Sequence, residues 1–183
     1  MMALLWQGGT AVATPAAHQP QFDDAVAAYE AGNFPRAFQL WQTLAAESDP
    51  AVLRNLGHML RRGLGVPRDE AAAFAYYKQA AQLGLPTAQL NLADAYETGM
   101  GTKSNLTEAR YWAGLAAKAG HPLAQYRYGK LLADGSGGPT KPDEALIYLT
   151  AALQAGVPQA ADTIEQVMQT LYPTLSEGQT PDE

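Results

Sequence analysis

The stretch that decides the fold is PTAQLNLADAYETGMGTKSNLTEARYWAGLAAKAGH, residues 86–121. Its glycines, prolines, alanines and one aromatic position recur at an offset of 36 residues, both upstream and downstream and without a gap. In the three registers the recurring positions are Gly63/Gly99/Gly135, Gly65/Gly101/Gly137, Ala73/Ala109/Ala145, Tyr76/Trp112/Tyr148, Ala80/Ala116/Ala152, Gly84/Gly120/Gly156, Pro86/Pro122/Pro158 and Ala88/Ala124/Ala160. Self-similarity at such a period indicates a repeat architecture, in which one supersecondary unit stacks on the next.

Each repeat is expected to hold two helices, here named helix A and helix B. A proline fits the first turn of helix A, because the missing N–H has no partner there anyway. The first glycine of each Gly-x-Gly pair ends helix A in a left-handed conformation, and the second lets the loop turn back. Asp69 and Asn105 are the expected N-caps of helix B, whereas Lys141 in the third copy moves the expected cap to Thr140.

The core of the stack is expected on one face of each A helix. Positions four residues apart on a helix share a face. The equivalent core positions are Leu56, Leu92, Tyr128 and Ile164, followed four residues later by Leu60, Tyr96, Leu132 and Met168. Small alanines on helix B allow the helices to approach closely, and one aromatic residue per repeat fills the space between pairs.

The sequence therefore predicts an all-α fold, a right-handed α/α solenoid of about four 36-residue helix–turn–helix repeats. Residues 25–46 form one further pair with a shorter turn, and residues 158–171 form a C-terminal capping helix. The predicted organisation is a leader over residues 1–22, a solenoid over residues 23–171 and a flexible tail over residues 172–183.

Composition restricts the class of partner. The chain has 183 residues, 47% of them hydrophobic, which is enough to bury a continuous core. Twelve Lys+Arg against eighteen Asp+Glu give a net charge of −6. An acidic chain lacks the overall attraction to phosphate backbones on which nucleic-acid binders depend, so nucleic acid is disfavoured. The absence of cysteine excludes disulfides, thiolate catalysis and Cys-type zinc sites.

The N-terminal segment has the pattern of an incomplete export signal. Residues 1–22 contain no Asp, Glu, Lys or Arg, and an Ala-x-Ala pattern at residues 11–13 follows a short apolar run. This resembles the second half of a signal peptide without its positive region, and a disordered leader is the alternative. The expected location is the bacterial envelope or periplasm, with the cytoplasm as the alternative. No other segment is long enough to span a membrane.

The repeat resembles the Sel-one-like repeats (SLR), a family related to the tetratricopeptide repeats. The resemblance covers about residues 23–171 and rests on the Leu-Gly, Gly-x-Gly, Ala-x-x-Tyr/Trp and Ala-Ala-x-x-Gly elements of each copy. The third copy departs from the pattern at Gly138, Pro139 and Lys141, and the first pair lacks the Gly-x-Gly loop. The resemblance implies an adaptor that holds protein partners, often in the bacterial envelope. No cofactor is expected.

Residues able to carry chemistry are sparse, and no catalytic or metal-binding residue is assigned. His58 lies one repeat before Asp94, so the two are candidates to face each other as an acid/base pair, although an ordinary polar contact is the favoured interpretation. The run from Asp134 to Gly138 lacks the spacing of a nucleophile turn. No phosphate-binding, dinucleotide or zinc-protease motif occurs.

The predicted function is a non-catalytic scaffold that binds a peptide or protein segment along the concave face formed by the A helices. A small-ligand-binding or hydrolase-like protein of the bacterial envelope is the alternative. The predicted partner-binding residues are the polar and aromatic ones beside the core stripe: Arg54, Asn55, His58, Arg61, Arg62, Asn91, Asp94, Glu97, Tyr126, Arg127 and Lys130. An ordinary solvated helix face is the competing interpretation of this row.

Overall fold

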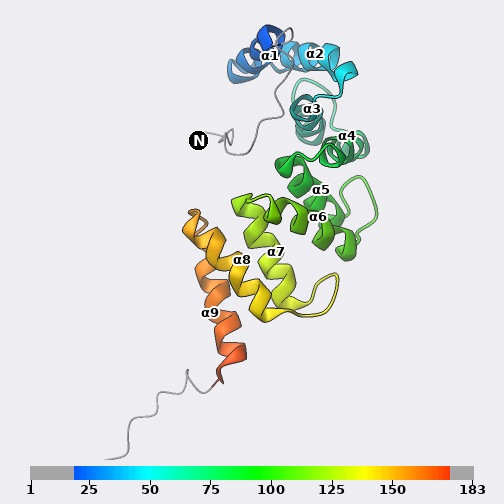
Figure 1. The fold of residues 1–183 in the computed structure, drawn as a ribbon. Helices are drawn as coiled ribbons and strands as arrows, with labels where there is room; N and C mark the ends of the chain where they lie inside the picture. The colour runs from blue at the N-terminus through cyan, green and yellow to red at the C-terminus, as the bar shows by residue number, and fades with distance from the viewer. Residues whose placement is uncertain (1–18, 174–183) are drawn as a thin grey trace, which may run out of the picture. The chain divides into compact units, whose positions relative to one another are not determined.

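A computed structural model describes residues 19–173, and within them the fold is all-α, as predicted. Helices account for 76% of the residues described, which include no strand. Residues 19–173 form nine α-helices, which are labelled in Figure 1, and the short 3-10 helix η1. Their bounds are α1 Gln19–Glu30, α2 Phe34–Leu44, η1 Ala45–Glu47, α3 Pro50–Arg62, α4 Glu70–Gln82, α5 Pro86–Thr98, α6 Leu106–Lys118, α7 Pro122–Asp134, α8 Pro142–Gln154 and α9 Gln159–Leu171.

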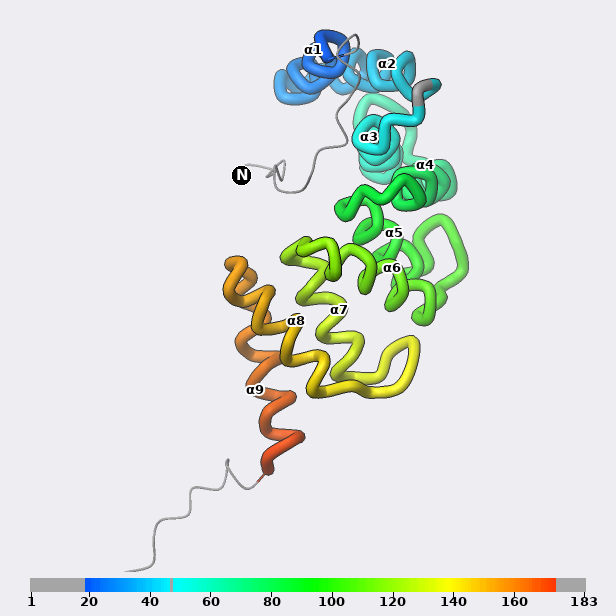
Figure 2. The backbone as a smooth tube through the Cα atoms, in the orientation of Figure 1, coloured from blue at the N-terminus to red at the C-terminus, as the bar shows by residue number. Residues whose placement is uncertain are grey.

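Consecutive helices pack against each other from α1 to α5 and again from α6 to α9, which is the arrangement of an α/α solenoid of repeats. The chain divides into two compact units, residues 1–104 and residues 105–183. Among the described residues, the first unit contains α1 to α5 and the second contains α6 to α9. The division falls between residues 104 and 105, at the end of the loop that joins α5 to α6 (Figure 2).

The predicted helix starts are largely confirmed. Proline occupies the first turn of α3, α5 and α7, and Pro158 immediately precedes α9. The Asp69 carboxylate accepts a hydrogen bond from the Ala72 N–H at 2.9 Å, and the Asn105 side chain accepts one from the Glu108 N–H at 3.2 Å. These side chains pair amide groups that the first helical turn leaves without a partner.

The expected cap of α8 at Thr140 is wrong, because no side chain caps this helix. Lys141 stands at the N-cap position, and its backbone N–H donates to the Leu132 carbonyl at 2.8 Å. Its ammonium group donates to the Glu144 carboxylate at 2.9 Å. Acidic Asp143 and Glu144 in the first turn complement the positive end of the helix dipole in place of a cap.

The two glycines of each loop have different physical roles. Gly99 ends α5 in the left-handed region with φ of +78°, as predicted. Gly101, also left-handed, lies against the first turn of α4, and a Cβ atom added there would be 2.0 Å from the Glu70 carbonyl oxygen. Gly137 has the same relation to Leu106 at 2.1 Å. Each loop therefore rests on the preceding B helix, a contact that only glycine permits.

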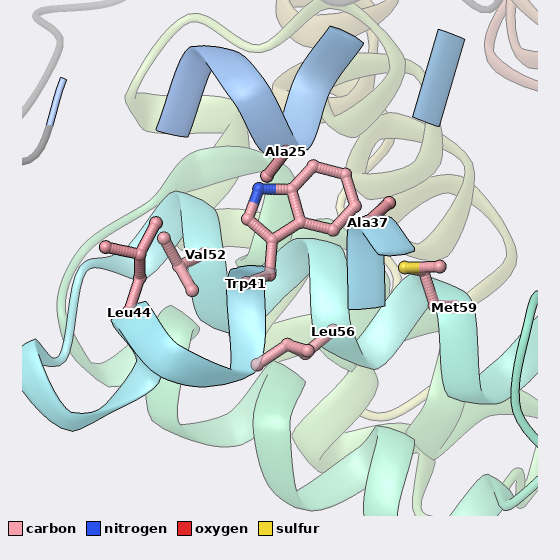
Figure 3. Close-up of a cluster of buried hydrophobic side chains, with 7 residues drawn as sticks. All are labelled: Ala25, Ala37, Trp41, Leu44, Val52, Leu56 and Met59. Carbon is pink, nitrogen blue, oxygen red and sulfur yellow. The ribbon is translucent and has the colours of Figure 1, made fainter. Parts of the chain in front are cut away.

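The core follows the predicted columns of small residues. The alanines of three columns, 73/109/145 and 80/116/152 on helix B and 88/124/160 on the following helix A, are all fully buried. The first unit also contains a cluster from α1, α2 and α3, drawn in Figure 3, that consists of Ala25, Ala37, Trp41, Leu44, Val52, Leu56 and Met59. The dense packing of alanine allows the close helix approach that the repeat requires.

One predicted core residue lies at the surface. Met168 is 38% exposed, whereas Leu132, its equivalent one repeat earlier, is fully buried in the cluster that α7 forms with α8. Among the described residues, α9 packs against α7 and α8, and no later helix covers the face that carries Met168. The prediction failed because burial there depends on a following helix B.

The ends of the predicted organisation lie partly outside the described residues. This applies to residues 1–18 of the expected leader and residues 174–183 of the expected tail. Helix α1 begins at Gln19, within the range assigned to the leader. Of the helices described, none combines the length and apolar character that a membrane crossing requires.

The loop contact predicts a large cost for Gly101→Ala. The left-handed backbone costs about 1 kcal/mol for a non-glycine residue, and displacing the Glu70 backbone adds about 1–3 kcal/mol. The free energy of unfolding, measured by urea denaturation, should therefore fall by about 3 kcal/mol. Gly120→Ala is the matched control, because Gly120 is also left-handed but has no atom near the added methyl group. Equal losses in the two variants would contradict the loop contact.

Candidate functional site

The predicted partner-binding residues lie on three A helices. Five are on α3 and three on α5, all in the first unit, and Tyr126, Arg127 and Lys130 are on α7 in the second. Nine of the eleven are half-buried, and only Arg62 and Lys130 are exposed. Charged side chains on an ordinary solvated helix face are mostly exposed. Partial burial of nine of these eleven residues therefore favours a binding surface over an ordinary solvated helix face.

The basic residues of α3 form one stripe. Arg54, His58 and Arg61 follow each other at intervals of four and three residues, so they share a helix face. The Arg54 Nη1 atom donates to the Asn55 Oδ1 atom at 3.1 Å, whereas the Nε atoms of Arg54 and Arg61 are buried without a hydrogen-bond partner. Burial lowers the pKa of Arg54, and the neighbouring positive charge of Arg61 acts in the same direction.

His58 pairs with a residue that the sequence did not indicate. Its Nε2 atom lies 3.2 Å from the Tyr29 hydroxyl of α1. Burial, followed by the charges of Arg54, Arg61 and Arg62, lowers the pKa of His58 to about 4. The ring is thus neutral near pH 7, and Nε2 accepts the hydrogen bond from Tyr29. A carboxylate acts in the opposite direction on a histidine pKa, and the charges that dominate at His58 are those of the arginines, so the suggested acid/base pair with Asp94 stays a prediction.

Tyr77 of α4 is a feature of this surface that the sequence analysis missed. Its ring lies over Gly57, where an added Cβ would be 2.9 Å from the ring carbons Cδ1 and Cε1. The side chain is 1% exposed, and its hydroxyl makes no hydrogen bond of normal geometry although Arg61 and Arg54 are near. Burial raises the pKa of Tyr77 against the opposing effect of these arginines.

A signal for Tyr77 does exist in the repeat alignment. The equivalent residues in the next two repeats are Ala113 and Leu149, neither of which has a polar side chain. Leu149 covers Gly129 as Tyr77 covers Gly57. The Tyr77 hydroxyl is therefore a polar group at a repeat position that is otherwise apolar. Because packing of the repeat does not need this hydroxyl, it marks Tyr77 as a candidate functional residue.

The polar residues of α5 adjoin the basic stripe of α3. The Asn91 Nδ2 atom is buried and has no hydrogen-bond partner. Asp94, one turn later, is close enough to raise the pKa of Tyr77 to a minor extent. The Glu97 backbone carbonyl accepts a hydrogen bond from the Ser104 hydroxyl at 3.0 Å, which ties the end of α5 to its loop. The arginines of α3 and the acidic residues of α5 therefore belong to neighbouring helices of the first unit.

The α7 residues belong to the second unit. Tyr126 packs against the hydrophobic core of that unit, Arg127 is half-buried and Lys130 is exposed. One groove that runs over all three A helices stays a prediction. Within residues 19–173, no group of three His, Asp or Glu side chains is arranged to hold a metal ion. The Ser136 N–H donates to the Asp134 carboxylate at 2.7 Å within the loop after α7.

The fold defines the class of protein as a helical-repeat solenoid. The family model described as Sel1 repeat matches residues 50–85, 86–121 and 122–157, which is more than half of the chain. The chain therefore belongs to the Sel1 repeat family. The three matched segments have the boundaries that the 36-residue period predicts.

Solved structures show the same fold. A Sel1 repeat protein from Oxalobacter formigenes has 30% identity and a TM-score of 0.75, over 80% of this chain and 60% of that one. A protective antigen of uropathogenic Escherichia coli with an SLR fold has 27% identity and a TM-score of 0.77, over 84% and 35%. The cysteine-rich protein B of Helicobacter pylori, at 18% identity and a TM-score of 0.52 over 78% and 96%, shows the fold alone.

The chain thus spans 60% and 35% of the length of the first two relatives. No curated protein sequence matches it. Sel1 repeats generally form protein-interaction scaffolds, and no catalytic family is indicated.

His58 should make the stability of the fold depend on pH. Its pKa is about 4 in the folded chain against an ordinary 6.5, so the unfolded chain binds the proton at higher pH. The stability gained from the neutral ring is complete above about pH 6.5 and is lost as the pH falls towards 4. From about pH 7 to about pH 5 we expect a loss of about 1 kcal/mol, discounted for the partial exposure of the ring.

Urea unfolding of the natural chain and of His58→Gln at both pH values tests this expectation. The variant keeps a polar side chain that does not titrate in this range, so its stability should change less between the two pH values. All other titrating groups, His121 included, cancel in the comparison. Identical pH dependence in the two proteins would contradict a depressed pKa at His58.

Proposed function

We propose that this Sel1 repeat protein is a non-catalytic scaffold that binds an extended peptide or protein segment along its A helices. The observation that carries the proposal is the set of half-buried polar side chains on α3 and α5, three of which have a buried donor atom without a hydrogen-bond partner. Desolvated polar groups are costly unless a partner supplies hydrogen bonds. A bound segment would supply them.

The charges on these helices supply a basis for selectivity. Helix α3 carries Arg54, Arg61 and Arg62, α5 carries Asp94 and Glu97, and α7 carries Arg127 and Lys130. We expect a basic, acidic and basic succession to select a segment of complementary charge and register. Tyr126 would add an aromatic contact of the kind that often dominates interface energies.

The B helices offer the competing surface. Tyr111 on α6 and Ile147 on α8, which are equivalent positions, are 58% and 68% exposed. Exposed large apolar side chains can also mark an interface. Among the described residues, α6 and α8 carry none of the unpaired buried donors found on α3 and α5. For this reason we favour the A helices.

A double variant separates the two surfaces. Arg54→Ala combined with Arg127→Ala should leave the helical content unchanged and weaken partner binding at least tenfold, about 1.4 kcal/mol. Lys78→Ala combined with Lys118→Ala removes the same charge from exposed B-helix positions and should have little effect. The partner is first identified by a photo-crosslinking residue placed at Asn55 or Glu97 in cells, and the affinities of the variants are then measured by calorimetry.

Crosslinkers at Tyr111 and Ile147 are the positional control. Partner adducts that form at these B-helix positions and are absent at Asn55 and Glu97 would place the interface on the opposite surface and overturn the proposal. A greater loss of affinity in the Lys78/Lys118 variant than in the Arg54/Arg127 variant would do the same.

We also propose that the protein acts in the bacterial envelope, on the basis of the signal-like pattern in residues 1–17. If the pattern is an export signal, native protein should begin between about residues 14 and 19. N-terminal sequencing of protein from fractionated cells tests this. Recovery of intact Met1 from the cytoplasmic fraction would contradict it.

A further inference from the structure

The described residues contain five buried side-chain donor atoms without a hydrogen-bond partner, and all five lie in the first unit. They are Trp41 Nε1, Arg54 Nε, Arg61 Nε, Tyr77 Oη and Asn91 Nδ2. The Trp41 indole belongs to the hydrophobic cluster of α1 to α3. The other four come from adjacent helices α3, α4 and α5. Since native proteins pair the great majority of their buried polar groups, such a concentration needs a reason.

The missing acceptors are best supplied by an anion. Each of the four atoms donates, and Tyr77 lies within electrostatic range of both Arg54 and Arg61. Arg54 and Arg61 act on Tyr77, and together with Arg62 they act on His58 of the same helix face, whereas Asp94 is the acidic residue that interacts with Tyr77. The local charge is therefore positive in a chain whose net charge is −6.

The geometry of Arg54 indicates the shape of the anion. Its Nη1 atom is occupied by Asn55, which leaves the edge formed by Nε and Nη2, and Nε on this edge is unpaired. The two parallel N–H groups of such an edge match the two oxygens of a carboxylate. The nearby charge of Asp94 disfavours a doubly charged phosphate more than a singly charged carboxylate.

We propose that Arg54, Arg61 and Tyr77 form a receptor for one carboxylate group of an acidic segment in the bound partner. This inference rests on the proposed function and names the chemistry of the group that the first unit recognises. The guanidinium groups would supply charge and paired N–H donors, and the Tyr77 hydroxyl would supply a neutral donor. Asn91, one turn before Asp94, offers a further donor at the α5 side.

Comparison among the repeats supports a role in binding. Arg54 corresponds to Leu90 and Tyr126, and Arg61 corresponds to Glu97 and Ala133. The second and third repeats thus form the same helix pair without this set of donors. The repeat fold does not require the arginines or the Tyr77 hydroxyl.

The receptor can be tested on the full chain with acetate as the probe. In NMR titrations, acetate should cause saturable shifts of the Arg54 and Arg61 Nε–H signals and raise the pKa of His58 by at least about half a unit, because a carboxylate offsets the arginine charges. Sodium chloride at equal ionic strength should do neither. N-acetylglycine and N-acetylglutamate methylamide then distinguish a chain-terminal carboxylate from a side-chain one. Tighter binding of inorganic phosphate than of acetate would overturn the carboxylate assignment.

Variants separate binding from stability. Tyr77→Phe removes a buried hydroxyl that makes no hydrogen bond of normal geometry, so the thermal unfolding midpoint should stay unchanged or rise, while acetate affinity falls at least about fivefold. Arg61→Gln should abolish the saturable response. Arg36→Gln is the matched control, because it removes the same charge from an exposed position on α2. A Tyr77→Phe protein with a lowered midpoint and an unchanged acetate response would show that the hydroxyl is structural and overturn the receptor.

The two proposals fail separately. Partner crosslinks at Asn55 or Glu97 without any acetate response would retain the A-helix interface and overturn the carboxylate receptor. An acetate response lost in Arg61→Gln, together with crosslinks confined to Tyr111 and Ile147, would retain the receptor as an anion site and overturn the scaffold interface.

Discussion

The loop between the two helices of a repeat lies directly on the first turn of the preceding B helix. At Gly101 the backbone comes so close to Glu70 that no side chain fits, and Gly137 meets Leu106 in the same way. This contact fixes the distance between successive helix pairs. The fully buried alanine columns follow from it, since helices held this close leave room only for a methyl group. Because each repeat makes one such contact, the glycine that permits it recurs every 36 residues in the sequence.

The same close packing creates the chemistry of the first unit. Gly57 on α3 leaves space for the Tyr77 ring to cross the helix, which brings a hydroxyl to the face that carries Arg54 and Arg61. In the third repeat the equivalent glycine, Gly129, is covered by Leu149, and this position is part of the hydrophobic core. A single difference in side-chain polarity thus converts a packing position into part of a polar surface.

Burial and like charge act together on that surface. Both lower the pKa of His58, which remains neutral and accepts a hydrogen bond from Tyr29. The unpaired donors beside it are destabilising in the free protein. An anionic ligand would relieve both the missing hydrogen bonds and the repulsion among the arginines. The repeat stack provides enough stability elsewhere for one unit to carry these unfavourable groups, which is a common property of binding sites.

The sequence alone determined the helix pairs, the bounds of α3 to α9 and the family, because proline geometry, left-handed glycine and helical periodicity act within a few residues or recur at a fixed offset. Only the tertiary structure decided that His58 pairs with Tyr29, that Tyr77 buries an unpaired hydroxyl and that Met168 is exposed. Each of these depends on which side chain of a neighbouring helix occupies the adjoining space. Burial and hydrogen-bond pairing arise from that packing, and a linear pattern does not contain them.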